Sequence, residues 1–281
     1  MPNDNGNLLL TEDEKIEILI LEPNSKKWIK PLLSAKEYLN GKKKWCLWLD
    51  GIQPNELKAM PEIYKRVNLV KKHRGLSNRL ATQKLAFSPH LFGEIRQPKS
   101  NYIFVPLTSS ENREYIPFDF IDKTYIANNS CSVIPNASIF HFGILTSKMH
   151  MTWMRYVCGR LESRYRYSNE IVYNNFPWPN DANKVQKKAI ENAAQKVLDI
   201  RKTYFKTGSS LVDLYDSIAM PVNLLKAHQA LDNAVDKFYR ETKFTTDQKR
   251  LEYLFNLYED YNANLFTEIE KPERKVKKKK V

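Results

Sequence analysis

Hydrophobic residues in the first 180 positions occur in short runs separated by polar and turn-forming residues, a pattern that favours β-strands. The runs that predict strands are residues 43–49, 102–106, 115–118, 130–135 and 170–176. Between them, residues 61–86 and 138–158 place apolar side chains at helical spacing, and the first of these segments carries many basic residues on its polar side. The N-terminal part of the chain is therefore predicted to mix strands and helices.

Two signals mark the ends of this mixed region. Thr11 and Glu14 have the S/T-x-x-E spacing of a capping box, which predicts a short helix that ends before Pro23. After Pro179 the strand pattern stops, and apolar residues recur at helical spacing. The segments concerned are residues 183–205, 220–240 and 245–266. The predicted fold class is α+β, with a mixed sheet-and-helix domain followed by an all-α helical domain and a boundary near residue 180.

The composition indicates a globular protein, because 42% of the 281 residues are hydrophobic and 12% are aromatic. No apolar run is long enough to predict a membrane span, and the N-terminus lacks the layout of a signal peptide. The three cysteines, Cys46, Cys131 and Cys158, lie far apart, which argues against a disulfide framework and against a zinc site. A reducing, cytoplasmic setting is predicted.

The charge balance points to a polyanionic partner. The formal net charge is +13, of which residues 271–281 carry +6, so residues 1–270 still carry +7. The lysine-rich end is predicted to be a disordered tail that binds phosphates without regard to sequence. The alternative is that the positive charge serves solubility alone.

The common catalytic motifs are not found. The eight glycines are too far apart for a dinucleotide-binding or phosphate-binding loop, and the five histidines lack metal-ligand spacing. Ser163 and Ser168 do not lie in a nucleophile elbow. Asp119 and Asp122 lack the acid-x-lysine spacing of metal-dependent nucleases and are interpreted as part of a turn between strands. No catalytic residue and no metal ligand is predicted in this chain.

The run GRLESRYRYS (159–168) alternates charged residues with tyrosines, as a strand with one charged face would. Such a strand would place Glu162, Arg164 and Arg166 on one face, and Leu161 and Tyr165 on the other. Arginine donates to guanine O6 and N7, while a carboxylate accepts from the cytosine amino group, so Glu162 and Arg164 could read one C·G pair. Arg166 could then reach the next base pair or a phosphate. The alternative is that Glu162 and Arg164 form only a surface ion pair.

GRLESRYRYSNEIVYNNFPWP (159–179) resembles the end of the target-recognition domain of the MmeI-like single-chain restriction-modification enzymes. These type IIG/IIL enzymes combine an endonuclease, an adenine-N6 DNA methyltransferase and a recognition domain in one polypeptide. The segments that also resemble the family, in the same order, are residues 5–15, 46–49, 81–98, 109–117, 142–160 and 220–239. The resemblance covers nearly the whole chain.

The resemblance implies a role for individual residues. Family members tend to carry E-x-R or K-x-D at this place, and the exchange accompanies C or G beside the methylated adenine. Glu162 and Arg164 form E-x-R here, which implies a site ending in A-C on the methylated strand. Arg166 is similar to the next specificity position, paired with a residue near Ser130. Further candidate DNA contacts are Ser109, Ser110 and Arg113 in a turn, and Lys71, Lys72 and Arg74 on the basic helix.

The family's catalytic parts have no counterpart in this sequence. NNFPWP (174–179) lacks the Pro-Pro turn of the N-P-P-Y/F methyltransferase motif and is interpreted as a structural hinge. The expected domains are a linker helix from a missing methyltransferase domain (1–25), the target-recognition domain (26–179), the helical domain (180–270) and the tail (271–281). The chain is then a cloned fragment or a split-gene product.

The implied partners are double-stranded DNA and the methyltransferase and nuclease domains of the same or a split polypeptide, with no membrane involved. The cofactors S-adenosylmethionine and Mg²⁺ are implied for those domains and not for this chain. Two alternatives stay open from the sequence. One is a stand-alone nucleic-acid enzyme with an unrecognised site, and the other is a protein that binds RNA or single strands by stacking bases on its tyrosines.

Overall fold

The computed structural model describes residues 3–179 and 183–267, and its first sheet joins strands that are distant in the sequence. The strand order is β1 (Leu9–Leu10), β3 (Trp45–Leu47), β2 (Ile29–Leu33) and β7 (Ile126–Ala127). Only β2 and β7 run parallel, while the other neighbours are antiparallel. The parallel pair brings the segment just before Ser130 to the first sheet and so ties the two halves of the N-terminal region together.

Helices and 3₁₀ turns lie between and after the first three of these strands. They are α1 (Glu12–Leu21), the 3₁₀ turn η1 (Pro23–Lys27), α2 (Ala35–Asn40), α3 (Pro54–Lys58), α4 (Pro61–Gly75), α5 (Leu80–Lys84) and the 3₁₀ turn η2 (Leu85–Phe87). The predicted capping box is confirmed, because the Glu14 amide donates to Thr11 Oγ1 and the Thr11 amide donates to the Glu14 carboxylate. Ile63, Val67 and Val70 of α4 bury one face of that helix in the same core as β3.

Two three-stranded antiparallel sheets follow. The first has the order β6 (Asp119–Ile121), β4 (Tyr102–Pro106) and β8 (Cys131–Pro135), with every residue of β4 buried. The second has the order β5 (Thr108–Ser109), β10 (Arg164–Arg166) and β9 (Gly159–Leu161). Helices α6 (Ile139–Leu145) and α7 (Lys148–Val157) and a π-helical turn, η3 (Asn169–Tyr173), complete this region.

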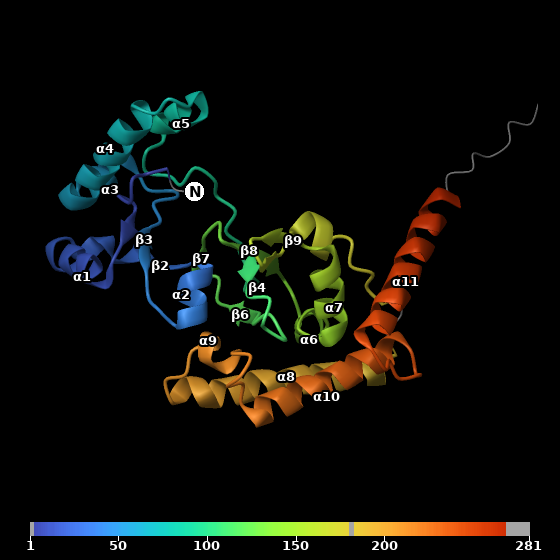
Figure 1. The fold of residues 1–281 in the computed structure, drawn as a ribbon. Helices are drawn as coiled ribbons and strands as arrows, with labels where there is room; N and C mark the ends of the chain where they lie inside the picture. Colours follow the sequence, from blue (N-terminus) through green and yellow to red (C-terminus); the bar gives the residue numbers. More distant parts are fainter. Residues whose placement is uncertain (1–2, 180–182, 268–281) are drawn as a thin grey trace, which may run out of the picture.

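The C-terminal region is helical, with α8 (Lys184–Lys206), α9 (Leu211–Leu214), α10 (Val222–Tyr239) and α11 (Asp247–Thr267). Figure 1 shows α8 and α10 side by side below α6, α7 and the sheet of β4, and α11 rising away from the end of α10. A single hydrophobic core includes residues of β4, α6, α8 and α10. Gly143 lets α6 approach α8 closely, because an added Cβ would lie 2.6 Å from a methyl of Ile190. The predicted α+β fold class is confirmed.

Several predicted elements differ from those observed. Residues 61–86 and 138–158 each form two helices instead of one, broken after Gly75 and at Thr146–Ser147. Residues 115–118 are buried without forming a strand. Residues 170–176 form the π-helical turn in place of a strand, and this turn is held by a hydrogen bond from Trp153 Nε1 to the Val172 carbonyl. Apolar content alone did not distinguish these buried turns from strands.

Within residues 3–179 and 183–267, no helix combines the length and apolar character needed to cross a bilayer. The expected phosphate-binding tail at 271–281 lies outside the residues that the structure describes.

Candidate nucleic-acid interface

Residues 159–166 form a β-hairpin, not the single strand that the alternation predicted. Strands β9 and β10 pair antiparallel, with Leu161 opposite Arg164 and Arg160 opposite Tyr165. Glu162 and Ser163 form the two-residue turn between them. Opposite residues of an antiparallel pair share a face, so Leu161 lies on the face of Arg164 and not on that of Tyr165. We call this segment the 159–166 hairpin.

The predicted acid and base do lie together at the end of the hairpin. Arg164 Nη2 and Glu162 Oε2 are 2.7 Å apart, and the side chains are 45% and 77% exposed. We call these two residues the E-x-R pair. An exposed ion pair is worth less than about 1 kcal/mol, so it orients the two groups without preventing either from contacting a ligand. The ion-pair interpretation and the base-reading interpretation are therefore compatible.

The turn holds Glu162 in an uncommon backbone conformation. Its φ is +55°, in the left-handed region that favours glycine in two-residue hairpin turns. A non-glycine residue there costs about 1–2 kcal/mol. A glutamate kept in such a position points to a role for its side chain, because strained residues concentrate at functional sites.

Replacing Glu162 with glycine is expected to leave the free energy of unfolding unchanged or to raise it by up to about 1 kcal/mol, because the left-handed strain is relieved. Any selectivity that depends on the carboxylate is expected to disappear in the same variant. Urea unfolding measures the first effect. Ser163→Gly is the matched control, since Ser163 is outside the positive-φ set and a glycine there should destabilise by about 0.5–1 kcal/mol. A stability loss in Glu162→Gly equal to the control's would contradict the strain argument.

The base of the hairpin is fixed in the core by tyrosines. Tyr165 is 9% exposed and pairs with Ser109 of β5, and the Tyr167 amide donates to the Leu107 carbonyl. Tyr167 Oη lies 3.0 Å from Nε2 of His150, whose pKa falls to about 3 because burial disfavours the charged ring. The E-x-R pair therefore projects from a hairpin whose base is buried against neutral side chains.

Arg166 and Ser130 are close neighbours through the backbone. Arg166 pairs with Thr108, and the amide of the preceding residue, Leu107, donates to the Ser130 carbonyl. The Ser130 hydroxyl accepts from the Ala35 amide at 2.9 Å and lies 2.6 Å from the Asn128 side chain. The hydroxyl thus holds its own loop, while Arg166 is exposed on the same face of β10 as Arg164.

The serines of the predicted contact turn differ in exposure. Ser109 is 3% exposed, its side chain is enclosed beside Tyr165, and its hydroxyl has no hydrogen-bond partner among the described residues. A direct DNA contact by the Ser109 side chain is therefore corrected to a structural role. Ser110 is partly exposed and forms a turn with Arg113, whose amide donates to the Ser110 carbonyl. Burial lowers the pKa of Arg113, and the charge of Asp216 partly offsets this effect.

Arg74 is also a correction, because the structure buries it completely. Its guanidinium donates to the carbonyls of Asn3, Leu85, Ser88 and Leu91 at 2.8–3.1 Å. It therefore fixes the N-terminal segment and the loop after α5 to α4. Lys71 and Lys72, three and two residues earlier, are exposed and stay predicted phosphate contacts.

Arg74→Lys is expected to lower the free energy of unfolding by about 2 kcal/mol. Lysine lacks the planar fork of five donors, so buried carbonyls would lose their partners at about 1–3 kcal/mol each, partly relieved by relaxation. Urea unfolding measures the change. Arg79→Lys, at an exposed arginine in the same region, is the control and should change stability by less than about 0.5 kcal/mol. Equal effects in the two variants would show that the buried guanidinium is dispensable.

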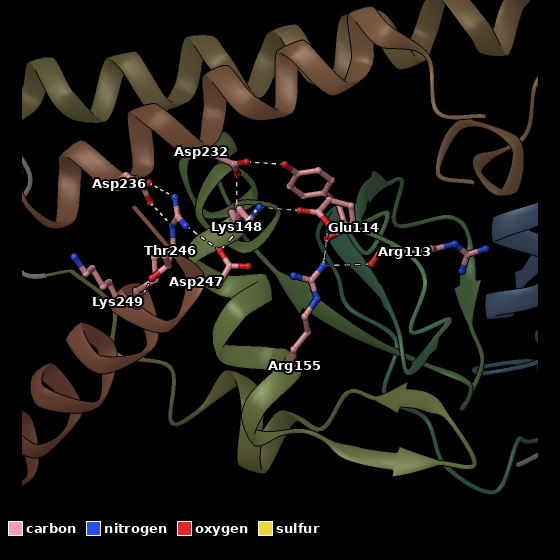
Figure 2. A network of polar contacts seen from close by, with 11 residues as sticks. Arg113, Glu114, Lys148, Arg155, Asp232, Asp236, Thr246, Asp247 and Lys249 are labelled. Atoms are coloured by element: carbon pink, nitrogen blue, oxygen red, sulfur yellow. Dashed lines mark hydrogen bonds and ion pairs between the residues drawn. The ribbon is translucent and has the colours of Figure 1, made fainter. Parts of the chain in front are cut away.

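A polar network attaches the contact turn to the helical region (Figure 2). Asp232 of α10 accepts hydrogen bonds from Tyr115 Oη and from the Lys148 amide, both at 2.6 Å. Burial raises the pKa of Asp232 to about 6. Lys148 Nζ lies 3.0 Å from the Glu114 carboxylate, and Figure 2 shows Arg113 directed away from this network. The helices thus fix the far end of the turn that begins at Ser110.

The α10–α11 corner carries a second part of the network. Arg250 pairs with Asp236 at 2.5 Å and with Asp247 at 2.9 Å. Among the described residues, no three His, Cys, Asp or Glu side chains gather where they could hold a metal ion. The acidic groups of Figure 2 instead contact basic side chains, a backbone amide and the Tyr115 hydroxyl.

Sequence reasoning did not single out Arg160 or Glu111. Arg160 faces Tyr165 across the hairpin, and Glu111 lies near Ser163. Arg160 would have been found by placing a two-residue turn at Glu162–Ser163, but no glycine or asparagine marks that turn in the sequence. Glu111 requires in addition the pairing of β5 with β10.

A hairpin with an exposed, charged tip thus projects from an α+β region that is joined to helices. The chain belongs to the MmeI family: residues 1–180 match the family described as "MmeI, target recognition domain", and residues 182–266 match "MmeI, C-terminal domain". The resemblance inferred from residues 159–179 is thereby confirmed.

Two relatives show the extent of the similarity. The chain is 38% identical over 260 residues to DNA methyltransferase A of Bacillus subtilis (strain 168). This match covers 92% of the chain and 29% of that protein. It is 44% identical to a solved structure of the type IIL restriction-modification enzyme MmeI in complex with DNA. The TM-score is 0.89, and the match covers 93% of this chain and 35% of that one. The chain thus spans about a third of the length of these relatives.

Proposed function

We propose that this chain selects the DNA site at which a larger restriction-modification enzyme acts, by reading base edges in double-stranded DNA. The observation that carries this proposal is the exposed E-x-R pair at the tip of the 159–166 hairpin, whose base is fixed in the core. A two-stranded ribbon fits the major groove, where all four base pairs can be distinguished. The solved relative described as a complex with DNA supports the same partner.

The finer proposal concerns one base pair. Arg164 donates to guanine O6 and N7, and Glu162 accepts from the amino group of the paired cytosine. The site then ends in A-C on the methylated strand. Arg166 reads the neighbouring pair, while Lys71 and Lys72 contact phosphates and set the register without specifying sequence.

The activities proposed for the whole protein are adenine-N6 methyl transfer and DNA cleavage, with S-adenosylmethionine and Mg²⁺ supplied to parts beyond the region matched here. We assign this chain the binding and orientation of the duplex and no chemical step. The three cysteines are free thiols, which suits the reducing cytoplasm in which we place the protein.

The single-strand alternative finds little support in this hairpin. Stacking of unpaired bases requires exposed aromatic faces, but Tyr165 and Tyr167 are 9% and 3% exposed. The hairpin exposes Glu162, Arg164 and Arg166, whose charged groups are suited to hydrogen bonding with paired bases. Leu161 is also exposed, on the face of Arg164, but it offers no aromatic ring for stacking.

Selection from a random duplex pool tests the proposal. The chain is incubated with the pool, bound duplexes are recovered and sequenced, and an enriched motif ending in A-C is expected. Single-stranded copies of the winning sequence serve as competitor and should compete poorly. A pool without any enriched motif, or better competition by single strands, would overturn the reading of double-stranded DNA.

A further inference from the structure

Arg160 contacts the hairpin in two ways that the E-x-R pair does not use. Its guanidinium carbon lies 3.9 Å from the centroid of the Tyr165 ring, directly across the two strands. Its Nη1 donates to the Ser163 carbonyl at 3.0 Å. The planar group thus covers a tyrosine that is anchored in the core, and at the same time it holds the turn.

Glu111 contacts the same turn from the neighbouring loop. Hydrogen bonding to its own amide is the largest effect that lowers the pKa of Glu111, followed by hydrogen bonding to Ser163 and by the nearby charges of Arg160 and Arg164. Glu111 therefore lies beside Ser163 and the two arginines, while the Ser163 carbonyl accepts from Arg160.

The turn needs such support because its conformation is unfavourable. Glu162 lies at φ +55°, and a two-residue turn without glycine has no intrinsic preference for this shape. Base reading by paired donors and acceptors is sensitive to displacement, because a functional group must be held within about 0.5 Å of its productive position. A group that fixes the turn would therefore decide how well the E-x-R pair discriminates.

We propose that Arg160 is a positioning residue for base reading, and this inference rests on the proposed function. It links the buried Tyr165 ring to the Ser163 carbonyl and so holds the E-x-R pair where both members meet one base pair. Lysine cannot replace it, since an ammonium group does not cover the ring with a flat face while donating along a fixed fork.

Arg160→Lys separates this role from a phosphate contact, because it keeps the charge. Equilibrium binding is measured over a range of salt concentrations to two duplexes from the selection experiment that differ only in C·G or G·C at the last position. The variant is expected to lose about tenfold in the ratio of the two affinities, the equivalent of one weakened base contact. The slope of affinity against salt should stay as in the parent chain.

Arg96→Lys is the matched control, because Arg96 is 81% exposed and pairs with Glu94 away from the hairpin. It should change neither the ratio nor the slope. A fraction of unfolded protein scales both affinities equally, so the ratio stays interpretable even if a variant is less stable. Arg160→Gln serves as a second variant, and its ratio of affinities for the two duplexes should fall as that of Arg160→Lys does.

Two results overturn the proposal. In the first, Arg160→Lys keeps the affinity ratio of the parent chain, while Arg160→Gln weakens binding to both duplexes equally and flattens the salt slope by about one charge. Arg160 is then a phosphate contact. If all variants keep the ratio and the slope, the contacts of Arg160 are irrelevant to reading. A parent chain that does not discriminate between the duplexes at all is a different failure, and it refutes the proposed function itself.

Discussion

The double variant Glu162→Lys with Arg164→Asp is expected to prefer G over C at the last base of the site. The exchange places a donor where the structure has an acceptor and the reverse, while the ion pair across the turn is retained with opposite polarity. Each base contact is worth about 1–3 kcal/mol of discrimination, so the ratio of affinities for the two duplexes should reverse by a factor on the order of a hundred or more. Random-duplex selection and direct binding to the two duplexes both measure the change.

Single and matched variants sharpen this experiment. Glu162→Lys alone places two cations within contact distance, so it should lose discrimination without gaining the new preference. The chain also offers a second E-x-R sequence, Glu94 and Arg96, which forms an exposed ion pair at 3.2 Å outside the hairpin. The same double exchange there should leave site preference unchanged. An unaltered preference for C in the Glu162–Arg164 exchange would refute the assignment of this base pair.

The helical half of the fold could be predicted well because its periodicity is strong. Residues 183–205 were expected to be helical, and α8 spans Lys184–Lys206. The fully apolar run at 102–106 likewise became the buried strand β4. In these segments local preference and burial agree, so the pattern is sufficient to identify the element.

The hairpin could not be predicted for a local reason. The sequence alternates charged residues and tyrosines, and this alternation does not distinguish one long strand from two strands joined at Glu162–Ser163. The turn also lacks the glycine or asparagine that usually marks a two-residue hairpin turn. The proximity of Glu162 and Arg164 could still be predicted, since the two residues are close in the sequence. What the sequence missed was the support, Arg160 and Glu111, because cross-strand contacts require the correct register.

The prediction that Arg74 contacts DNA is a different kind of error, because the sequence itself indicated that this residue is buried. It follows Ile63, Val67 and Val70 at helical spacing and so lies on the apolar face of α4. Its positive charge suggested a phosphate contact, but position on the helix outweighs residue type here. The same spacing places Arg201 after Ile190, Ala194 and Val197 on α8, where it is 1% exposed.

Arg201 connects the helical region to the sheet of β4. Its Nε donates to Tyr215 Oη and its Nη1 to the Phe118 carbonyl, each at 2.5 Å, and Nη1 lies 3.8 Å from the Asp119 carboxylate. Burial raises the pKa of Asp119, and the charge of Arg201 is the main effect that opposes this rise. The arginine therefore favours the charged form of a largely enclosed carboxylate.

Arg201→Met is expected to lower the free energy of unfolding at pH 8 by about 3–5 kcal/mol, because it leaves the Asp119 charge without its partner. Without the arginine, the pKa of Asp119 rises further in the folded state. A carboxyl with a raised folded pKa binds its proton more tightly when folded, so stability increases as the pH falls through that value. The deficit relative to the parent chain should thus be smaller at pH 5 than at pH 8, as measured by urea unfolding at both values.

Lys202→Met, at the exposed neighbour on α8, is the control and should have little effect at either pH. The double variant Arg201→Met with Asp119→Asn should recover part of the loss, because replacing both charges of a buried pair costs less than removing one. If Arg201→Met were as stable as the control, the contacts with Tyr215 and Phe118 would contribute little. If its deficit were the same at pH 5 and pH 8, the loss would come from packing, and the charge of Asp119 would not be the cause.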